Sequence, residues 1–374
     1  MPHLLYAAPH SLYSAKVRCY LRKQAIDYRE VLPSAERFVR HIVPRIGRGI
    51  IPVLETPDGR IIQDSVDIID HFEAQGVRYP AYPGGPRQRV LALLIEYYAS
   101  LPLLRPAMHY RWSFLAEQQA FIRDAFVSAS GAAAAEQIMG RMASYLPALG
   151  VSAATIPLIE ASHMRLLDIL EAHFSEHPYL FGGRPSIADY GLIGPLFAHL
   201  ARDPVPGQLM KQRAPKVFRW VERMNASDLD SPEFPDAGDD FLADDAIAPT
   251  LQPLLRHIAE EVFPELDDCL AFLDQWVARE QPQDGDPVAR AAHQRRLGEV
   301  STHLRGVELV AGVQPYMVYL LRRVDRFIDS LAAGPRQAVE DCLAECGLSG
   351  LRVGQRGYSV DRRNNIEVWE IPAG

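Results

Sequence analysis

Asp64 and Ser65 form a pair of side chains that could bind a charged small molecule. They stand directly before Val66, Ile69 and Phe72, whose spacing predicts a helix that begins at Asp64 or Ser65. A free helix N-terminus offers unpaired N–H groups and a partial positive charge, and both suit a carboxylate ligand. The alternative is that one of the two residues only caps the helix, since Asp and Ser are common N-caps.

A small unit of strands and helices precedes this pair and must position it. The apolar run 4–8 predicts a first strand, and a helical pattern through Val17, Tyr20 and Leu21 follows it. An Asp-Gly step at 58–59 lies between apolar runs, which is a strong hairpin signal. The predicted strands therefore cover residues 4–8, 28–32, 50–55 and 60–63.

This order of elements, with Ile51-Pro52 followed by Asp64-Ser65, resembles the N-terminal domain of the glutathione transferases. The resemblance implies a thioredoxin-like α/β domain with glutathione as co-substrate. In the family, the residue before a cis proline pairs its backbone with the cysteinyl part of glutathione, which implies Ile51 and a cis bond to Pro52. Asp64 would then meet the γ-glutamyl ammonium, while Ser65 and its own N–H would bind the γ-glutamyl carboxylate.

The stretch Ser11–Arg18 resembles the start of the family's first helix, where a hydroxyl group activates the glutathione thiol. A free thiol titrates near pH ~8.5 and only the thiolate is nucleophilic, so lowering its pKa by two units requires about 2.7 kcal/mol of stabilisation. The match implies that Ser11 donates to the sulfur. Leu12 stands where the family usually has proline, which keeps Ser14 as a rival, and Tyr6 is a third candidate because some classes use a tyrosine after the first strand. A further alternative is that these serines only cap the helix.

The glycyl carboxylate of glutathione needs cations from the segment before Ile51. Arg45 and Arg48 are placed for this contact, and a guanidinium suits a carboxylate. The alternative for each of these arginines is an ordinary position on the protein surface, with no role in binding. Candidates for lining the second-substrate pocket are Tyr13, Met108, His109, Tyr110 and Trp112.

The composition fits a soluble enzyme in a reducing, cytoplasmic setting. The chain has 374 residues, 48% of them apolar, and a net charge of −8, which argues against a nucleic-acid partner. No apolar stretch near ~20 residues stands out, so no membrane association is expected. The four cysteines are sparse and irregular, and they predict neither disulfides nor a metal site. They are Cys19, Cys269, Cys342 and Cys346.

Three domains are expected, at residues 1–78, 87–226 and 245–374. Helical periodicity dominates after residue 87, and Pro102 and Pro106 must kink or break its first run. Ser186 and Asp189 form a Ser-x-x-Asp capping motif. It resembles the sequence motif at the start of a buried helix in the all-helical C-terminal domain of the family. Residues 227–245 read as an acidic linker, 253–280 and 286–331 as helical, and 351–371 as strands.

The predicted fold is therefore a thioredoxin-like domain, an all-helical transferase domain and a mainly helical extension. The predicted function is a glutathione transferase that conjugates or modifies a small electrophile, and the resemblance implies a homodimer. The alternatives are a non-catalytic glutathione-binding or partner-binding protein, and a glutathione-dependent isomerase or peroxidase. The apolar stripes of the extension, which one or two helices cannot bury alone, predict that it packs on the transferase-like body.

Overall fold

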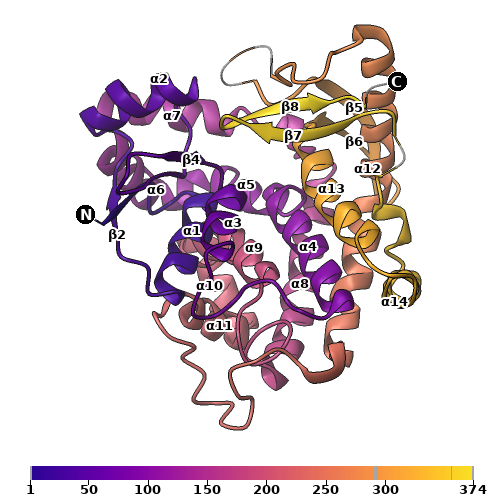
Figure 1. The fold of residues 1–374 in the computed structure, drawn as a ribbon. Helices are drawn as coiled ribbons and strands as arrows, with labels where there is room; N and C mark the ends of the chain where they lie inside the picture. The colour runs from indigo at the N-terminus through magenta and orange to yellow at the C-terminus, as the bar shows by residue number, and fades with distance from the viewer. Residues whose placement is uncertain (1, 290, 292–293, 355, 373–374) are drawn as a thin grey trace.

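Residues 3–73 form a four-stranded mixed sheet flanked by helices (Figure 1). The strand order is β2-β1-β3-β4, with β1 parallel to β2 and antiparallel to β3. This computed structural model describes residues 2–289, 291, 294–354 and 356–372. The elements are β1 (His3–Tyr6), α1 (Leu12–Lys23), β2 (Tyr28–Val31), α2 (Val43–Ile46), β3 (Val53–Glu55), β4 (Ile61–Gln63) and α3 (Ser65–Glu73).

The two faces of the sheet are covered by different helices. Alternate residues of a strand point to opposite faces, so Leu5 joins the large core with α1 and α3, whereas Tyr6 joins a smaller cluster with Phe38 and Ile46 beside α2. The predicted thioredoxin-like α/β arrangement is confirmed.

The next part of the chain is entirely helical up to residue 225. The predicted break near Pro102 is present, because α4 ends at Ser100 and α5 begins at Leu104. Residues 115–143 form two helices that meet at Gly131, which has a φ of +80°. The helices are α4 (Pro86–Ser100), α5 (Leu104–Trp112), α6 (Leu115–Ser130), α7 (Ala132–Ala143), α8 (Ile156–Glu176), α9 (Ile187–Pro195), α10 (Pro204–Arg213) and α11 (Pro215–Asn225).

The start of α9 is held by the buried side chain of Asp189. Its carboxylate accepts hydrogen bonds from the backbone N–H and the hydroxyl of Ser186, both at 2.9 Å, and from the N–H of Leu180 at 3.1 Å. The indole N–H of Trp220 on α11 donates to the same carboxylate at 3.2 Å. The predicted capping motif is therefore also a link between two helices of the domain core.

The extension contains two β-hairpins among its helices. Residues 286–315, predicted as part of a helical region, include the antiparallel pair β5–β6. Its strands alternate buried and exposed residues, and Arg305 and Gly306 both have a positive φ, as a tight hairpin turn requires. The predicted strands near the C-terminus are confirmed as β7–β8. The elements are α12 (Gln252–Glu280), β5 (Gly298–Leu304), β6 (Val307–Val313), α13 (Tyr316–Asp329), α14 (Ala333–Glu345), β7 (Ser359–Arg363) and β8 (Ile366–Glu370).

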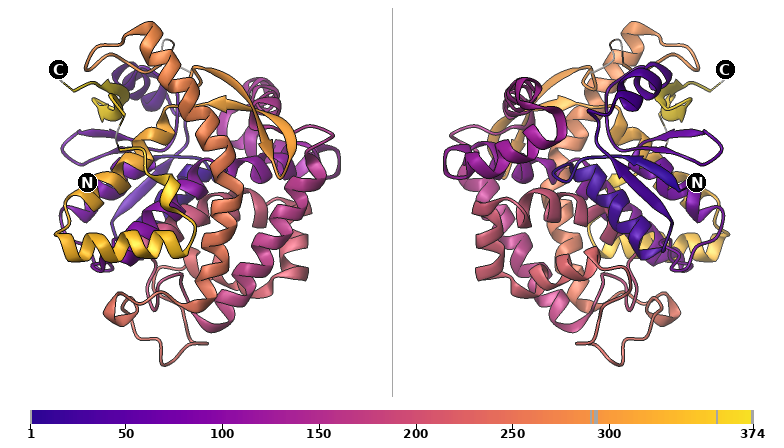
Figure 2. Two further views of the ribbon diagram at one scale, coloured as in Figure 1. Left: turned by 90° about the vertical axis from the view of Figure 1, so that its right-hand side faces the viewer. Right: turned by 90° about the vertical axis from the view of Figure 1, so that its left-hand side faces the viewer.

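The extension packs on the transferase-like body, as predicted. Leu5 of the sheet, Leu94 of α4, Leu255 of α12 and Leu321 of α13 belong to one contiguous buried core. Helix α13 lies against α4, and the long helix α12 runs beside the helical part (Figure 2). The acidic stretch before α12 is also tied to the body, since the N–H of Leu242 donates to the carbonyl of Phe181 at 2.8 Å.

One helical stretch, Pro86–Trp112, is long and apolar enough for a membrane span by length and composition alone. However, 78% of its apolar window is buried inside the protein. Its apolar character is explained by its place in the core.

Candidate functional site

Asp64 and Ser65 lie where β4 ends and α3 begins. The carboxylate of Asp64 accepts a hydrogen bond from the N–H of Val66 at 2.9 Å, so Asp64 is the N-cap of α3. Its φ of +105° is rare for a residue with a side chain, and such strained positions concentrate at ligand-binding sites. Ser65 is buried, and its hydroxyl has no hydrogen-bond partner among the described residues.

Ile51 lies beside this helix start. The bond between Ile51 and Pro52 is cis, as predicted. Val53, two residues after Ile51, pairs with Gln63, which is two residues before Ser65, so Ile51 lies near the start of α3. Within the described chain, the backbone N–H and carbonyl of Ile51 have no partner. An extended ligand could therefore pair with Ile51 as another strand would.

Ser11 is the N-cap of α1, and its hydroxyl can act as a donor. Its oxygen accepts from the N–H of Ser14 at 3.4 Å, while its hydrogen has no acceptor in the described part of the chain. Ser14 is fully buried and accepts from the N–H of Ala8 at 3.4 Å, so it faces the interior of the loop. These contacts favour Ser11 over Ser14 as a donor to a ligand.

The hydroxyl of Tyr6 is engaged on the α2 face of the sheet. It donates to Glu55 at 2.8 Å, and Glu55 also accepts from Arg37. Burial, followed by the contact with Glu55, raises the pKa of Tyr6 to about 12. Its ring contacts Phe38 in the cluster beside α2, so Tyr6 packs as a core residue of the sheet.

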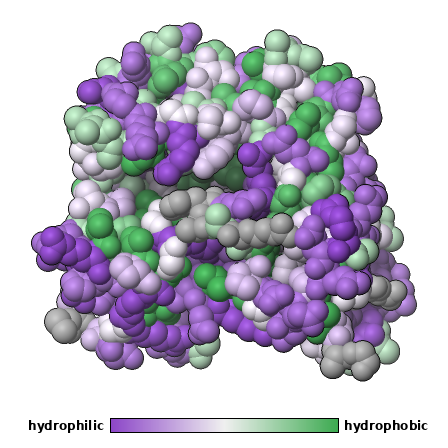
Figure 3. Space-filling model, turned by 90° about the horizontal axis from the view of Figure 1, so that it is seen from above, coloured by the Kyte–Doolittle hydropathy of each residue, from purple (hydrophilic) through white to green (hydrophobic). Residues whose placement is uncertain are grey.

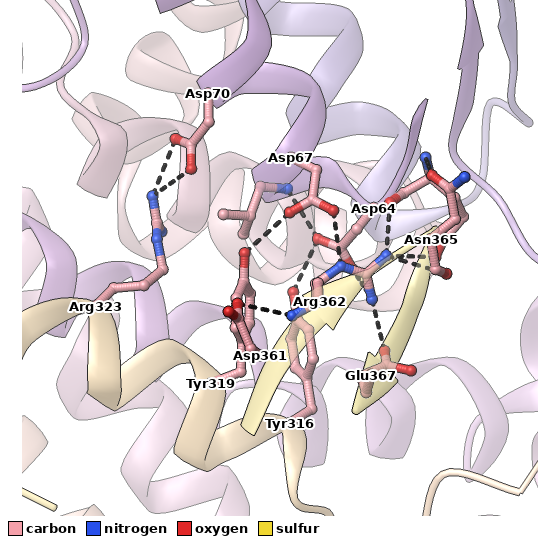
Figure 4. Close-up of polar contacts among 12 residues, drawn as sticks. Asp64, Asp67, Asp70, Tyr316, Tyr319, Arg323, Asp361, Arg362, Asn365 and Glu367 are labelled. Atoms are coloured by element: carbon pink, nitrogen blue, oxygen red, sulfur yellow. Dashed lines mark hydrogen bonds and ion pairs between the residues drawn. The ribbon is translucent and has the colours of Figure 1, made fainter. Parts of the chain in front are cut away.

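The extension reaches the predicted glutathione site from a great distance along the sequence (Figure 4). Tyr316, at the start of α13, donates from its hydroxyl to the Asp64 carboxylate at 2.9 Å. Arg362 on β7 lies 4.0 Å from the same carboxylate and donates to the carbonyl of Gln63 at 2.6 Å. The carboxylate predicted to meet the γ-glutamyl ammonium therefore already has partners from the extension.

The turn of the β7–β8 hairpin contacts the edge strand of the sheet. The side-chain oxygen of Asn365 accepts from the N–H of Gln63 at 2.8 Å. Arg48 pairs with Glu367 of β8 at 2.9 Å and donates to the side chain of Gln63 at 3.0 Å. Arg48, predicted to bind the glycyl carboxylate, thus holds a carboxylate of its own chain, and Arg45 is exposed and donates to the carbonyl of Gly59.

Two further contacts clamp α13 onto α3. The hydroxyl of Tyr319 donates to Asp67 at 2.9 Å, and Arg323 donates to both oxygens of Asp70 at 3.0 and 3.1 Å. Arg323 also pairs with the buried Glu96 of α4 at 2.8 Å. Hydroxyl and guanidinium groups of α13 therefore bind carboxylates along α3 and hold the extension against this helix.

Glu367 is the buried anion at the centre of this contact. Burial alone would raise its pKa, but Arg295, Arg362 and Arg48 hold the pKa down at about 2. A carboxylate with a depressed folded-state pKa stabilises the protein above its unfolded pKa of about 4.3, and this stability is lost as pH falls toward 2.

We expect Glu367→Gln to remove this acid-dependent stability. In the wild type, up to about 3 kcal/mol of the free energy of unfolding should be lost between pH 5 and 2 through this group. Urea unfolding across that range, compared with Glu370→Gln on the same strand, measures it. An equally steep acid loss in both variants would contradict the assignment.

The predicted pocket residues do not share one cavity. Met108 and Trp112 pack in a cluster with α6 and α7, whereas Tyr110 stacks on Phe114 with the ring planes 12° apart. His109 lies 3.0 Å from Glu160 of α8. The face that carries α2 and the β7–β8 hairpin is nevertheless hollowed near its centre, with apolar side chains at the bottom (Figure 3).

The site residues that the sequence did not predict all come from the extension. Within β7–β8, Asn364 and Asn365 both have a positive φ, so the Asn-Asn pair is a sequence signal for the hairpin turn. No local signal shows that this turn lies against Gln63. The described residues contain no group of three or more His, Cys, Asp or Glu side chains that could hold a metal, and all four cysteines are free thiols.

Comparisons with known sequences identify two regions. Residues 5–78 match the sequence model of the glutathione S-transferase N-terminal domain, and residues 153–223 match that of the glutathione S-transferase C-terminal domain. No curated protein matches the sequence significantly.

Solved structures with similar folds include several glutathione transferases. One from Xanthobacter autotrophicus Py2 is 23% identical with a TM-score of 0.36, covering 60% of this chain and 93% of its own. A beta-etherase from Sphingobium sp. strain SYK-6 is 18% identical with a TM-score of 0.44, covering 60% and 96%. A Methylobacterium radiotolerans glutathione S-transferase, in complex with glutathione sulfonate, is 19% identical with a TM-score of 0.37, covering 63% and 94%.

The order of the two matched domains agrees with the fold. The first covers the sheet with its cis proline and the start of α3, and the second covers α8 to α11 with the Asp189 motif. The chain therefore carries the N- and C-terminal domains of the glutathione S-transferases, and a long extension follows them.

Proposed function

We propose that this protein binds glutathione between the starts of α1 and α3 and uses its thiolate to conjugate or modify a small electrophile. The observation that carries the proposal is the unpaired backbone of Ile51, which lies beside Ser65. The register of β1 and β3, extended from Tyr6 and Val53, puts Ile51 opposite Ala8, three residues before Ser11. A peptide that pairs with Ile51 has a donor hydroxyl on one side and a helix N-terminus on the other.

Each part of glutathione then has a partner in this chain. Ile51 pairs with the cysteinyl backbone, Ser11 donates to the sulfur, and Ser65 binds the γ-glutamyl carboxylate. Among the described residues, the second oxygen of Asp64 accepts no hydrogen bond and lies 4.0 Å from Arg362, so it can accept from the γ-glutamyl ammonium. The terminal nitrogens of Arg48 bind Glu367 and Gln63, and its Nε, which has no partner among the described residues, is the donor left for the glycyl carboxylate.

The second candidate is a glutathione-binding protein without catalysis. The observation that favours it is the occupation of Asp64 by Tyr316 and of Arg48 by Glu367. The two candidates differ in the fate of the thiol, since only a transferase must lower its pKa. A cytoplasmic location and a homodimer stay predictions for either candidate.

Calorimetric titration of glutathione tests the binding site. We expect Ser65→Ala to weaken binding roughly tenfold, because a hydrogen bond to a charged carboxylate contributes about 1.5 kcal/mol or more. Ser330→Ala, an exposed serine on the extension, should bind like the wild type. Equal affinity in Ser65→Ala and Ser330→Ala would remove Ser65 from the site, and turnover of a chlorinated nitrobenzene with glutathione separates the transferase from the non-catalytic candidate.

A further inference from the structure

Arg295 is a residue of the extension that is held over the start of α3. One of its terminal nitrogens donates to Glu367 at 3.1 Å, and its guanidinium lies 4.9 Å from the centre of the Tyr316 ring. The hydroxyl of that tyrosine donates to Asp64, the N-cap of α3. Two anchors thus fix the guanidinium next to the predicted γ-glutamyl end of the site.

Arg295 differs from the other two arginines that contact Glu367. The side chains of Arg362 and Arg48 are 3% and 5% exposed, and the terminal nitrogens of both donate to groups of the protein. The side chain of Arg295 is 31% exposed, and among the described residues Glu367 is the acceptor for its N–H groups. Arg295 therefore has donors to offer a ligand.

The surroundings of Arg295 point to the ligand's position. Against the effect of burial, Arg362 and then Arg295 lower the pKa of Asp64, the N-cap of α3; burial raises the pKa of Tyr13, in the first turn of α1, to about 12, and Arg295 opposes that rise. The charge of Arg295 therefore acts on residues at the starts of both α1 and α3. Ser65 directly follows Asp64, is a buried residue, and its hydroxyl has no hydrogen-bond partner among the described residues.

We propose that Arg295 is a ligand-binding residue that takes the α-carboxylate of the γ-glutamyl group together with Ser65. A guanidinium presents paired N–H groups that match a carboxylate, and the N-terminus of α3 adds unpaired backbone donors to it. This inference rests on the proposed function. Its consequence is that the extension completes the glutathione site with a cation that neither family domain contains.

The test compares two ligands in the full-length protein. One is glutathione, and the other is its analogue with 4-aminobutyrate in place of the γ-glutamyl residue, which lacks the α-carboxylate. Calorimetry should show that Arg295→Ala weakens glutathione binding roughly tenfold to a hundredfold and changes analogue binding less than about twofold. Arg296→Ala removes the neighbouring arginine, which pairs with the exposed Glu299, and should leave both affinities unchanged.

The outcomes separate this role from the proposed function. A wild-type protein that binds no glutathione would overturn both. Wild-type binding of glutathione that Arg295→Ala leaves unchanged would overturn only the role of Arg295. Tighter binding in Arg295→Ala would overturn that role too and would mean that this side chain obstructs the site. Arg295→Lys keeps the charge beside Glu367 but loses the paired donors, so an intermediate affinity for glutathione is expected. An equal loss of both ligands in Arg295→Ala would also contradict a contact with the α-carboxylate.

Discussion

Arg362→Ala is expected to lower the free energy of unfolding by about 3–5 kcal/mol. The guanidinium of Arg362 is almost fully buried and donates to Asp67, Glu367 and Gln63 at 2.6–2.8 Å. Breaking a buried ion pair by removing one partner leaves an uncompensated charge, and this is the source of the large cost. The loss should separate the β7–β8 hairpin from the sheet edge before the rest of the chain unfolds.

Arg363→Ala provides the matched control on the same strand. Arg363 pairs with Asp284, and both side chains are about half exposed. An exposed pair contributes roughly 0–1 kcal/mol, so this variant should unfold close to the wild type. Urea unfolding measures both variants. Similar stabilities for Arg362→Ala and Arg363→Ala would mean that the hairpin does not rest on the sheet as described.

Ser11→Ala is expected to reduce the rate of conjugation roughly tenfold to a hundredfold below neutral pH. A hydrogen bond to a charged group contributes about 1.5–3 kcal/mol, and here it would stabilise the thiolate over the thiol. The variant should therefore raise the pKa of bound glutathione by about one to two units. Absorbance of the thiolate, followed against pH in the presence of saturating protein, measures that pKa directly.

Tyr6→Phe and Ser14→Ala test the two rivals in the same assay. Tyr6→Phe keeps the ring in its cluster and removes only the hydroxyl that donates to Glu55, so the pKa of the thiol should not change. Ser14→Ala removes a buried hydroxyl that accepts from Ala8 and should also leave that pKa in place. A larger shift in either variant than in Ser11→Ala would transfer the activating role to that residue.

The sequence predicted the parts of the site that rest on local patterns. The cis bond at Ile51–Pro52 and the helix that begins after Asp64 each depend on a few neighbouring residues, and the structure has both. The packing of the extension followed from its apolar stripes, which had to be buried somewhere.

The partners of Asp64 lay beyond such patterns. Tyr316 and Arg362 are about 250 and 300 positions away along the chain, and no periodicity relates a hydroxyl or guanidinium to a distant carboxylate. The same limit applies to Arg48, which was expected to bind a ligand carboxylate and instead holds Glu367. The sequence shows which side chains are cationic and which are anionic, but it does not show which of them form ion pairs in the folded protein.

The error over 286–315 has a different cause. Apolar residues of β5 and β6 recur at spacings of three and four residues, which fit a helix as well as two short strands; they are Val300, Leu304, Val307 and Ala311. The turn between the strands distinguishes the two, because Arg305-Gly306 allows a positive φ at both positions. The Arg-Gly turn signal, although weak, indicated the observed hairpin, whereas the apolar spacing alone could not distinguish a hairpin from a helix.

The central claim is that the chain binds glutathione as a thiolate. Calorimetry of glutathione binding at pH 7, repeated in two buffers with different ionisation enthalpies, gives both the affinity and the number of protons released. If the pKa of the bound thiol falls from about 8.5 to about 6.5, roughly 0.7 proton should be released per site, and the analogue with serine in place of cysteine should bind and release none. Saturable binding of glutathione without proton release would contradict activation of the thiol, and the absence of saturable binding would contradict the site itself.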